Sequence, residues 1–270
     1  MATTLTPGEI AAIVADHERA RATATPIRRV THVHPDMTID DAYAIQRAWV
    51  DLQVAGGSTI IGHKIGLTSR AMQQAMNIDE PDFGALLDYM AVDTGASLTA
   101  ADYVDPKLEV ELAFVLGDRI DSPDVTVADV IAATDYVTPA LELIDARSYR
   151  RDPDDGITRT VCDTISDNAA NAGVVTGARR VEPGSIDLRW VAAIMKRNGI
   201  VEETGVAAGV LGDPVLGIVW LARRLHGFGV ALEPGQIILA GSFTRPVDCR
   251  AGDEFHVDFG ELGVITLDFR

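Results

Sequence analysis

The sequence predicts an α+β fold in which a small helical region precedes a core built mainly of mixed strands. Helical periodicity with clear capping residues is concentrated in residues 6–56, whereas residues 236–270 consist of short strands and turns. No glycine-rich nucleotide-binding loop of the GxGxxG or Walker type is present. Strands joined by hairpins with few intervening helices are typical of α+β proteins and not of folds that alternate strands and helices.

The composition excludes several classes of protein. The chain has 270 residues, of which 47% are hydrophobic, enough for a sizeable core. Its net charge of -17 argues against binding to nucleic acid or to anionic membranes. Cys162 and Cys249 lie far apart and form no CxxC pair, and no apolar run is long enough for a signal peptide or a membrane span. We therefore expect a cytoplasmic protein.

Two helices are predicted near the amino terminus. The first covers residues 6–22. The second is capped by Thr38 and ends at Gly56. Its apolar stripe consists of Ala42, Ile45, Trp49 and Leu52. We expect residues 1–57 to form a helical region that packs on a core of residues 58–270.

The core begins with a strand-like run, residues 59–69, in which Lys64 stands between apolar residues. Such a lysine is either a surface residue whose stem packs on its neighbours or a desolvated amine with a functional partner. Flanking glycines, Gly62 and Gly66, permit close backbone approach and favour the second interpretation. Asp82 follows in a predicted turn-rich loop, where it either serves function or completes a turn.

Residues 106–116 predict a strand that directs two carboxylates to the same side. With a period of two residues, Glu109 and Glu111 share one face, and their Cα atoms lie roughly 6 to 7 Å apart. A third acid, Glu142, lies in a strand-like apolar run, residues 138–145. Three carboxylates without a histidine pair favour a hard cation such as Mg²⁺ or Mn²⁺ over zinc. The alternative is that these glutamates face solvent on a half-exposed strand.

The remaining segments complete the α+β pattern. A short capped helix is predicted for residues 126–133, and the basic, polar residues 147–156 predict a mobile loop or lid. Residues 163–173 are rich in small and polar side chains, which fits either a tight turn or a pocket wall. Asn198-Gly199 predicts a hairpin, and a helix covers residues 213–227. The buried stripe predicted for this last helix consists of Leu216, Val219, Trp220 and Leu225.

Six ordered motifs resemble the hydratase and decarboxylase family of aromatic meta-cleavage pathways, part of the fumarylacetoacetate hydrolase superfamily. The motifs are residues 62–69, 80–84, 108–114, 139–142, 163–169 and 241–246. The resemblance runs from about residue 38 to the end of the chain. It implies a fumarylacetoacetase C-terminal-like mixed β-roll or barrel as the metal-binding catalytic core.

The resemblance also implies roles for five residues. In the superfamily an E-x-E pair and a later glutamate bind a divalent metal, which here are Glu109, Glu111 and Glu142, with Mg²⁺ as the expected ion and Mn²⁺ as the alternative. Lys64 and Asp82 match family positions proposed to act in proton transfer. These two residues are therefore the expected catalytic pair.

The implied substrate is a small dicarboxylate, a 2-hydroxy-2,4-dienoate that is ketonised and then hydrated. Its distal carboxylate needs an arginine or a backbone nest, for which Arg147, Arg150 and Arg245 are candidates. The residues expected to bind the substrate are Leu67, Ser69, Arg147, Ser166, Asn168, Ser242 and Thr244.

Several alternatives remain open from the sequence. A sister decarboxylase or a hydratase of 2-oxopent-4-enoate would use the same metal site. Hydrolysis of a β-diketone would need a placed histidine, whereas His63 is expected to point away from Lys64. A non-catalytic partner subunit is disfavoured because all five expected site residues are intact. The family further implies a homo-oligomer, and association with a pathway decarboxylase is left open.

Overall fold

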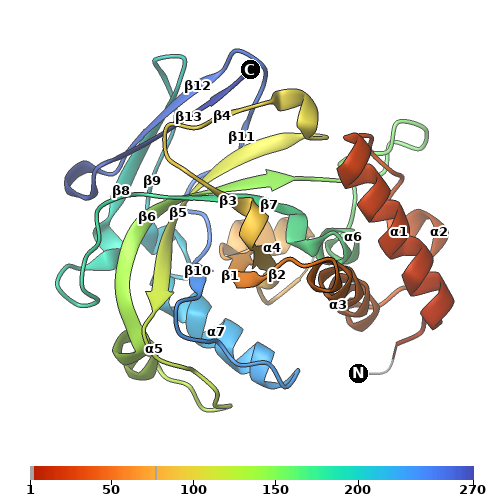
Figure 1. Ribbon diagram of the computed structural model, residues 1–270, viewed down its shortest axis with the longest axis horizontal. Helices are drawn as coiled ribbons and strands as arrows, with labels where there is room; N and C mark the ends of the chain where they lie inside the picture. Colours follow the sequence, from red (N-terminus) through yellow and green to blue (C-terminus); the bar gives the residue numbers. More distant parts are fainter. Residues whose placement is uncertain (1–2, 77) are drawn as a thin grey trace.

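The computed structural model describes residues 3–76 and 78–270, and its core consists of two β-sheets (Figure 1). The strands of the larger sheet are β1 (Ile60–Gly66), β2 (Asp82–Leu87), β3 (Ala91–Val92), β5 (Pro106–Leu116), β6 (Thr134–Asp145), β7 (Asn171–Thr176), β10 (Ile237–Leu239) and β11 (Val247–Asp248). Those of the smaller sheet are β4 (Ser97–Leu98), β8 (Ala192–Arg197), β9 (Ile200–Val206), β12 (Glu254–Asp258) and β13 (Val264–Phe269).

The larger sheet curls into a half-barrel. Its strand order is β2-β1-β10-β5-β6-β7-β3, with β11 paired to β5, and the smaller sheet has the order β4-β13-β12-β8-β9. Parallel and antiparallel pairs occur in both sheets, since β1 pairs with β10 in parallel and with β2 antiparallel, and β13 pairs with β4 in parallel. The long strands β5 and β6 form the bent centre of the larger sheet (Figure 1). This mixed architecture confirms the predicted α+β class.

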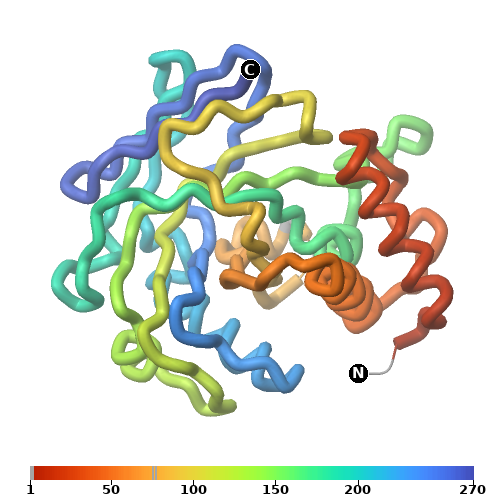
Figure 2. Tube along the Cα trace, viewed as in Figure 1, coloured from red at the N-terminus to blue at the C-terminus, as the bar shows by residue number. Residues whose placement is uncertain are grey.

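Helices connect and flank the strands of the two sheets (Figure 1). They are α1 (Pro7–Thr23), α2 (Val30–Val33), α3 (Ile39–Ala55), α4 (Arg70–Met76), α5 (Val127–Ala133), α6 (Val161–Ser166) and α7 (Pro214–His226). Short 3₁₀ turns are η1 (Asp88–Met90), η2 (Ala100–Asp102), η3 (Asn168–Ala170), η4 (Leu188–Trp190), η5 (Ala207–Gly209) and η6 (Gly260–Leu262). Figures 1 and 2 show α1 and α3 together at one side of the molecule, next to α6. Within the described ranges, no helix is long and apolar enough to cross a membrane.

Reciprocal capping explains where the first two long helices begin. At α1, the Thr6 hydroxyl accepts a hydrogen bond from the Glu9 backbone N–H, and the Glu9 carboxylate accepts one from the Thr6 backbone N–H, which is a capping box. Thr38 and Asp41 form a second capping box at the start of α3. Both predicted helices are thereby confirmed. The stripe predicted on α3 is wrong at Leu52, which is exposed because the buried face turns toward α1 and α6. The division of the chain at residue 57 stays a prediction.

Later elements also match the sequence pattern in type. Asn198 and Gly199 have φ values of 53° and 80° and close the hairpin between β8 and β9, as predicted. On α7 the predicted stripe is wrong at Leu216, which is 40% exposed. The buried face of α7 is rotated from the predicted one and includes Val215, Ile218 and Leu221.

Candidate metal centre

Three carboxylates from β5 and β6 converge on one point. Glu109 lies directly opposite Glu142 in the antiparallel β5–β6 register, and Glu111 follows Glu109 on the same face. Each of the three side chains offers an oxygen within 4.8 Å of the others. Glu111 and Glu142 are fully buried and Glu109 is partly exposed, which excludes the alternative of a solvent-facing strand. The centre is therefore open to solvent on the side of Glu109.

Neighbouring groups hold these carboxylates but leave an oxygen on two of them without a partner. The backbone N–H of Gly241 donates to Glu111 Oε2 at 2.8 Å, and the amide of Asn171 donates to Glu142 Oε1 at 2.8 Å. Within the described chain, Glu111 Oε1 and Glu142 Oε2 are buried and accept no hydrogen bond. A buried anionic oxygen without a donor is costly, so these atoms are oriented for a cation.

The raised pKa values of Glu109 and Glu111 also indicate a site for a cation. Burial and the charge of Glu142 raise the pKa of Glu109 to about 7. Burial, Glu142 and Glu109 raise the pKa of Glu111 well above its usual range. Like charges at this distance repel unless a positive charge lies between them. A hard divalent cation fits this set of oxygen donors.

Lys64 supplies a positive charge at the edge of the carboxylate cluster. It lies on β1 with its side chain buried, and its Nζ is 3.2 Å from Glu142 Oε1. Burial disfavours the ammonium form, but the charges of Glu142 and Asp82 outweigh that effect and raise the pKa of Lys64. Lys64 is thus a charged, desolvated amine and not a surface residue, which decides between the two interpretations of the sequence.

Asp82 lies beside Lys64, on the first residue of β2. The loop predicted at this position is wrong for residues 82–84, because Asp82 pairs with Gly66 in the β1–β2 ladder. Its Oδ1 is buried and has no hydrogen-bond partner in the described chain. Burial raises the pKa of Asp82, and the positive charges of Lys64 and Arg159 oppose the increase.

The helical region and the polar segment after α6 hold the Asp82 strand in place. Gln46 on α3 donates from Nε2 to the carbonyl oxygens of Phe83 and Ile165, at 2.8 and 3.1 Å. Asn168 forms two hydrogen bonds with the backbone of Ala85, accepting at Oδ1 and donating from Nδ2. The side chain of Asn168, predicted to bind substrate, is therefore engaged with β2.

Two of the predicted substrate-binding residues follow β1 in the chain. Leu67 follows β1 with a φ of 54°. Ser69 lines a cavity of about 610 Å³ and accepts a hydrogen bond from the Met72 N–H at the start of α4. Their substrate role stays a prediction.

Ser242 and Thr244 brace the strand that carries the glutamates. The Ser242 hydroxyl donates to the carbonyl oxygen of Val110 at 3.3 Å, and the Thr244 hydroxyl accepts from the Val110 N–H at 3.4 Å. Ser166 donates its hydroxyl to the Asp163 carbonyl oxygen within its own helix. These contacts position backbone, and contact with substrate stays a prediction for all three hydroxyls.

Each of the three arginines predicted for the distal carboxylate forms an ion pair with an acidic residue of the chain. Arg147 is buried, pairs with Asp167 Oδ1 at 2.6 Å and donates to the Asn171 carbonyl oxygen at 2.7 Å, contacts typical of a structural ion pair. Arg245 has an 85% exposed side chain and pairs with Glu203. Arg150 pairs with Asp105.

Sequence reasoning missed two residues near the centre. Asn171, the partner of Glu142, belonged to the segment predicted as a turn or pocket wall, but no pattern distinguished it from its polar neighbours. Arg159 lies just beyond the predicted basic loop. Its charge reaches Asp82 only through the tertiary fold.

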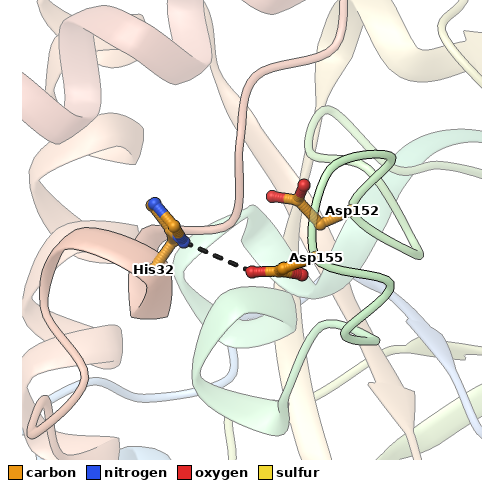
Figure 3. A group of neighbouring side chains, drawn as sticks. All are labelled: His32, Asp152 and Asp155. Atoms are coloured by element: carbon orange, nitrogen blue, oxygen red, sulfur yellow. Dashed lines mark ion pairs between the residues drawn. The ribbon is translucent and has the colours of Figure 1, made fainter.

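A second carboxylate cluster lies apart from the centre. His32, Asp152 and Asp155 approach one another, with His32 Nδ1 3.5 Å from Asp155 Oδ2 (Figure 3). Their carboxylates already have cationic partners, since Arg28 pairs with Asp152 at 2.8 Å and Arg29 with Asp155 at 2.6 Å. The cluster therefore fastens the segment before α2 to the loop after β6.

Comparisons with known proteins agree with this geometry. Residues 61–270 match the family described as fumarylacetoacetate (FAA) hydrolase C-terminal. The chain is 54% identical to the 2-oxo-hept-4-ene-1,7-dioate hydratase of Escherichia coli over 93% of this chain and 94% of the relative. It is 36% identical to the 2-keto-4-pentenoate hydratase of Paraburkholderia xenovorans, over 93% of this chain and 91% of the relative.

A solved structure extends the likeness to the whole fold. The 4-oxalocrotonate decarboxylase of Pseudomonas putida G7, complexed with magnesium and adipate, superposes with a TM-score of 0.94 and 33% identity over 100% of both chains. The resemblance predicted from the six motifs is confirmed. The chain belongs to the fumarylacetoacetate hydrolase family, with hydratases and a decarboxylase among its relatives.

Proposed function

We propose that this chain is a divalent-metal-dependent hydratase that converts 2-oxo-hept-4-ene-1,7-dioate to 4-hydroxy-2-oxoheptanedioate in aromatic catabolism. The observation that supports this most strongly is the cluster of Glu109, Glu111 and Glu142 beside Lys64 and Asp82. It occurs in a chain 54% identical to a hydratase of that substrate. We place the enzyme in the cytoplasm as a homo-oligomer.

In this proposal Glu109, Glu111 and Glu142 hold Mg²⁺, with Mn²⁺ as the alternative. Bound there, the ion would supply Lewis acidity that withdraws electrons from the 2-oxo group of the substrate and makes C4 of the conjugated 2-oxo-3-ene electrophilic. Asn171 and the Gly241 N–H keep Glu142 and Glu111 oriented toward the ion. Both contacts lie outside the ligand set, and such partners commonly tune metal affinity.

Asp82 and Lys64 move the protons in the proposed reaction. The scheme begins from the 2-hydroxy-2,4-dienoate tautomer of the substrate. Because burial raises the pKa of Asp82, its carboxylate is a competent base for the 2-hydroxyl proton of this tautomer and then, once the 2-oxo-3-ene has formed, for the water that attacks C4. Lys64 is charged and donates from Nζ to carbon, first at C5 during ketonisation and then at C3 after water has added. Hydration thus places the hydroxyl on C4 and a proton on C3, and the two side chains return to their starting states through proton exchange.

A decarboxylase is the second candidate. The TM-score of 0.94 to a 4-oxalocrotonate decarboxylase over the whole chain favours it, because the same arrangement of strands serves that enzyme. A hydratase of the monoacid 2-oxopent-4-enoate is supported by the 36% identical relative.

Product analysis separates these reactions. Freshly ketonised 2-hydroxyhepta-2,4-diene-1,7-dioate and 2-oxo-3-hexenedioate are each incubated with the protein and either Mg²⁺ or EDTA, and products are followed by ultraviolet absorbance and NMR. The proposal expects Mg²⁺-dependent formation of the 4-hydroxy-2-oxo diacid from the first substrate and no CO₂ from the second. Mg²⁺-dependent CO₂ release from the second would establish a decarboxylase instead.

A further inference from the structure

Arg150 and Arg159 are brought together by a small hairpin between β6 and α6. The Arg159 N–H donates to the Arg150 carbonyl oxygen at 3.0 Å, and Arg151 and Thr158 form an antiparallel bridge one step further along. The turn is closed by the Asp152 N–H, which donates to the Ile157 carbonyl oxygen at 2.9 Å. Two arginines therefore face each other at the base of the hairpin, where Asp105 pairs with Arg150, and a second anion would further reduce the repulsion between the two guanidinium groups.

The hairpin is anchored at its tip. Arg28 and Arg29 pair with Asp152 and Asp155, the carboxylates drawn with His32 in Figure 3. The backbone of Ile27 adds hydrogen bonds to the chain just before the hairpin. The tip carboxylates are satisfied by these arginines, so they do not neutralise Arg159 at the base.

Arg159 has an unsatisfied guanidinium. Its side chain is 9% exposed, and its Nη1 has no hydrogen-bond partner in the part of the chain that the structure describes. Its nearest carboxylate oxygen, Asp167 Oδ2, is 3.8 Å away, and Asp167 already pairs with Arg147 at 2.6 Å. A buried cation without close partners is costly to maintain. Burial and the adjacent charge of Arg150 lower the pKa of Arg159 to about 10.

Both arginines are close enough to the candidate metal centre for their charges to act on it. The charge of Arg159 acts on Asp82, and the charge of Arg150 acts on Glu109. Glu109 is the carboxylate that is partly exposed, so the charge of Arg150 acts on the side of the centre that is open to solvent. The centre itself is acidic, and a dianionic substrate needs a separate positive site for its second carboxylate.

We propose that Arg159, assisted by Arg150, binds the distal carboxylate of the substrate and makes the site selective for diacids over monoacids. This inference rests on the proposed function for the orientation of the substrate. A guanidinium matches a carboxylate with two parallel N–H donors, and Nη1 of Arg159 is a buried donor that no acceptor of the described chain occupies. Arg147, the residue expected from the sequence, has its donors committed to Asp167 and Asn171.

The test compares two ligands that differ only in the distal carboxylate. Isothermal titration calorimetry measures binding of 2-oxoheptanedioate and of 2-oxohexanoate to the Mg²⁺-loaded wild type and to Arg159→Met, Arg159→Lys and Arg151→Met. We expect Arg159→Met to weaken binding of the diacid by roughly 10- to 100-fold and binding of the monoacid by less than about threefold, since hydrogen bonds to charged groups contribute in this range. Arg159→Lys should recover part of the preference, and Arg151→Met, an exposed arginine of the same hairpin, should change neither ligand.

The outcomes separate this inference from the proposed reaction. An unchanged preference in Arg159→Met, or an equal loss of both ligands, would overturn the role of Arg159 even if the wild type hydrates the diacid. If the wild type prefers the diacid through Arg159 but produces no hydrated product, the carboxylate site stands and the proposed reaction fails. A wild type that binds both ligands equally would also overturn the inference.

Discussion

Gly66 shows how little space separates the two side chains that we assign to proton transfer. A Cβ on Gly66 would lie 2.2 Å from Asp82 Oδ1 and 3.2 Å from Lys64 Nζ. Only glycine at this position lets the carboxylate and the ammonium approach each other across the β1–β2 ladder. The glycine thus belongs to the site although it has no side chain.

Substitution of Gly66 by alanine tests this proximity. The methyl group must displace Asp82, and because small misplacements of reacting groups are costly, we expect kcat to fall about 100-fold. The free energy of unfolding should fall by only about 1 to 3 kcal/mol. Steady-state kinetics and urea unfolding check both effects, with Gly8→Ala, whose new methyl meets open space, as the control. A Gly66→Ala enzyme with wild-type kcat would refute the proximity argument.

Removal of the Lys64 amine tests its role as proton donor. In Lys64→Ala we expect kcat to fall by about 100-fold or more, because general acid catalysis contributes in that range. Mg²⁺ binding should persist, since the three carboxylates remain. Kinetics and metal titration of this variant are compared with Lys196→Ala in the smaller sheet. Retained turnover would show that Lys64 is not the donor.

At the scale of elements, single aspartates join segments that are distant in sequence. Asp41 is fully buried, completes the cap of α3 and accepts hydrogen bonds from the backbone of Thr4 and Leu5. Asp163 likewise caps α6 and accepts from the N–H and hydroxyl of Thr31. These contacts join the amino-terminal residues to α3 and join α2 to α6.

Asp41→Asn should destabilise the protein by about 2 kcal/mol at pH 7, because a charge-assisted set of hydrogen bonds is lost. Burial acts to raise the pKa of Asp41, but hydrogen bonds from Thr38, Leu5 and Thr4 outweigh it and hold the pKa below its usual range. A lowered folded-state pKa contributes stability above the unfolded value of about 4, and the contribution is lost as pH falls below it.

The measurement is urea unfolding of wild type and Asp41→Asn at pH 7 and at pH 3. The difference in unfolding free energy between the two proteins should shrink at the lower pH. Asp40→Asn, in the same first turn, serves as the control. A difference that is the same at both pH values would contradict the assignment of the stabilisation to the ionised carboxylate.

The elements could be predicted from the sequence better than the faces they bury. Capping residues marked the start of α3 and Asn198-Gly199 marked the β8–β9 hairpin, because these signals are local. Leu52 and Leu216 were assigned to buried stripes but are exposed, since neighbouring elements decide which part of a helix is covered. The sequence predicts a loop at Asp82, because the strand there forms by pairing with β1 and has no local signal of its own.

For the molecule as a whole, the sheet explains why some residues of the metal centre could be predicted from the sequence and others could not. Alternation within β5 was enough to place Glu109 and Glu111 on one side. The order of the strands places Glu142 opposite Glu109 and brings Asn171 to Glu142. A distant hairpin positions Arg159. No local pattern in the sequence contains these relations. Assembly as a homo-oligomer also depends on surfaces that the sequence does not rank, and it stays a prediction.

The central claim is that β5 and β6 bring three carboxylates together to bind a divalent cation. Without the ion these like charges repel one another in a buried position, so the metal-free protein should be destabilised by its own site. Binding of the ion to the folded state alone should then raise the melting temperature. Glu111→Gln removes one of these charges at nearly constant volume.

The most direct measurement is the thermal unfolding of wild type and Glu111→Gln in EDTA and in excess Mg²⁺ or Mn²⁺. We expect the ion at about 100 times its Kd to raise the wild-type Tm by about 5 to 8 °C. Glu111→Gln should melt above the wild type in EDTA and gain little from the ion. A wild-type Tm that is unchanged by the ion, together with a Glu111→Gln protein that melts below the wild type in EDTA, would contradict the claim.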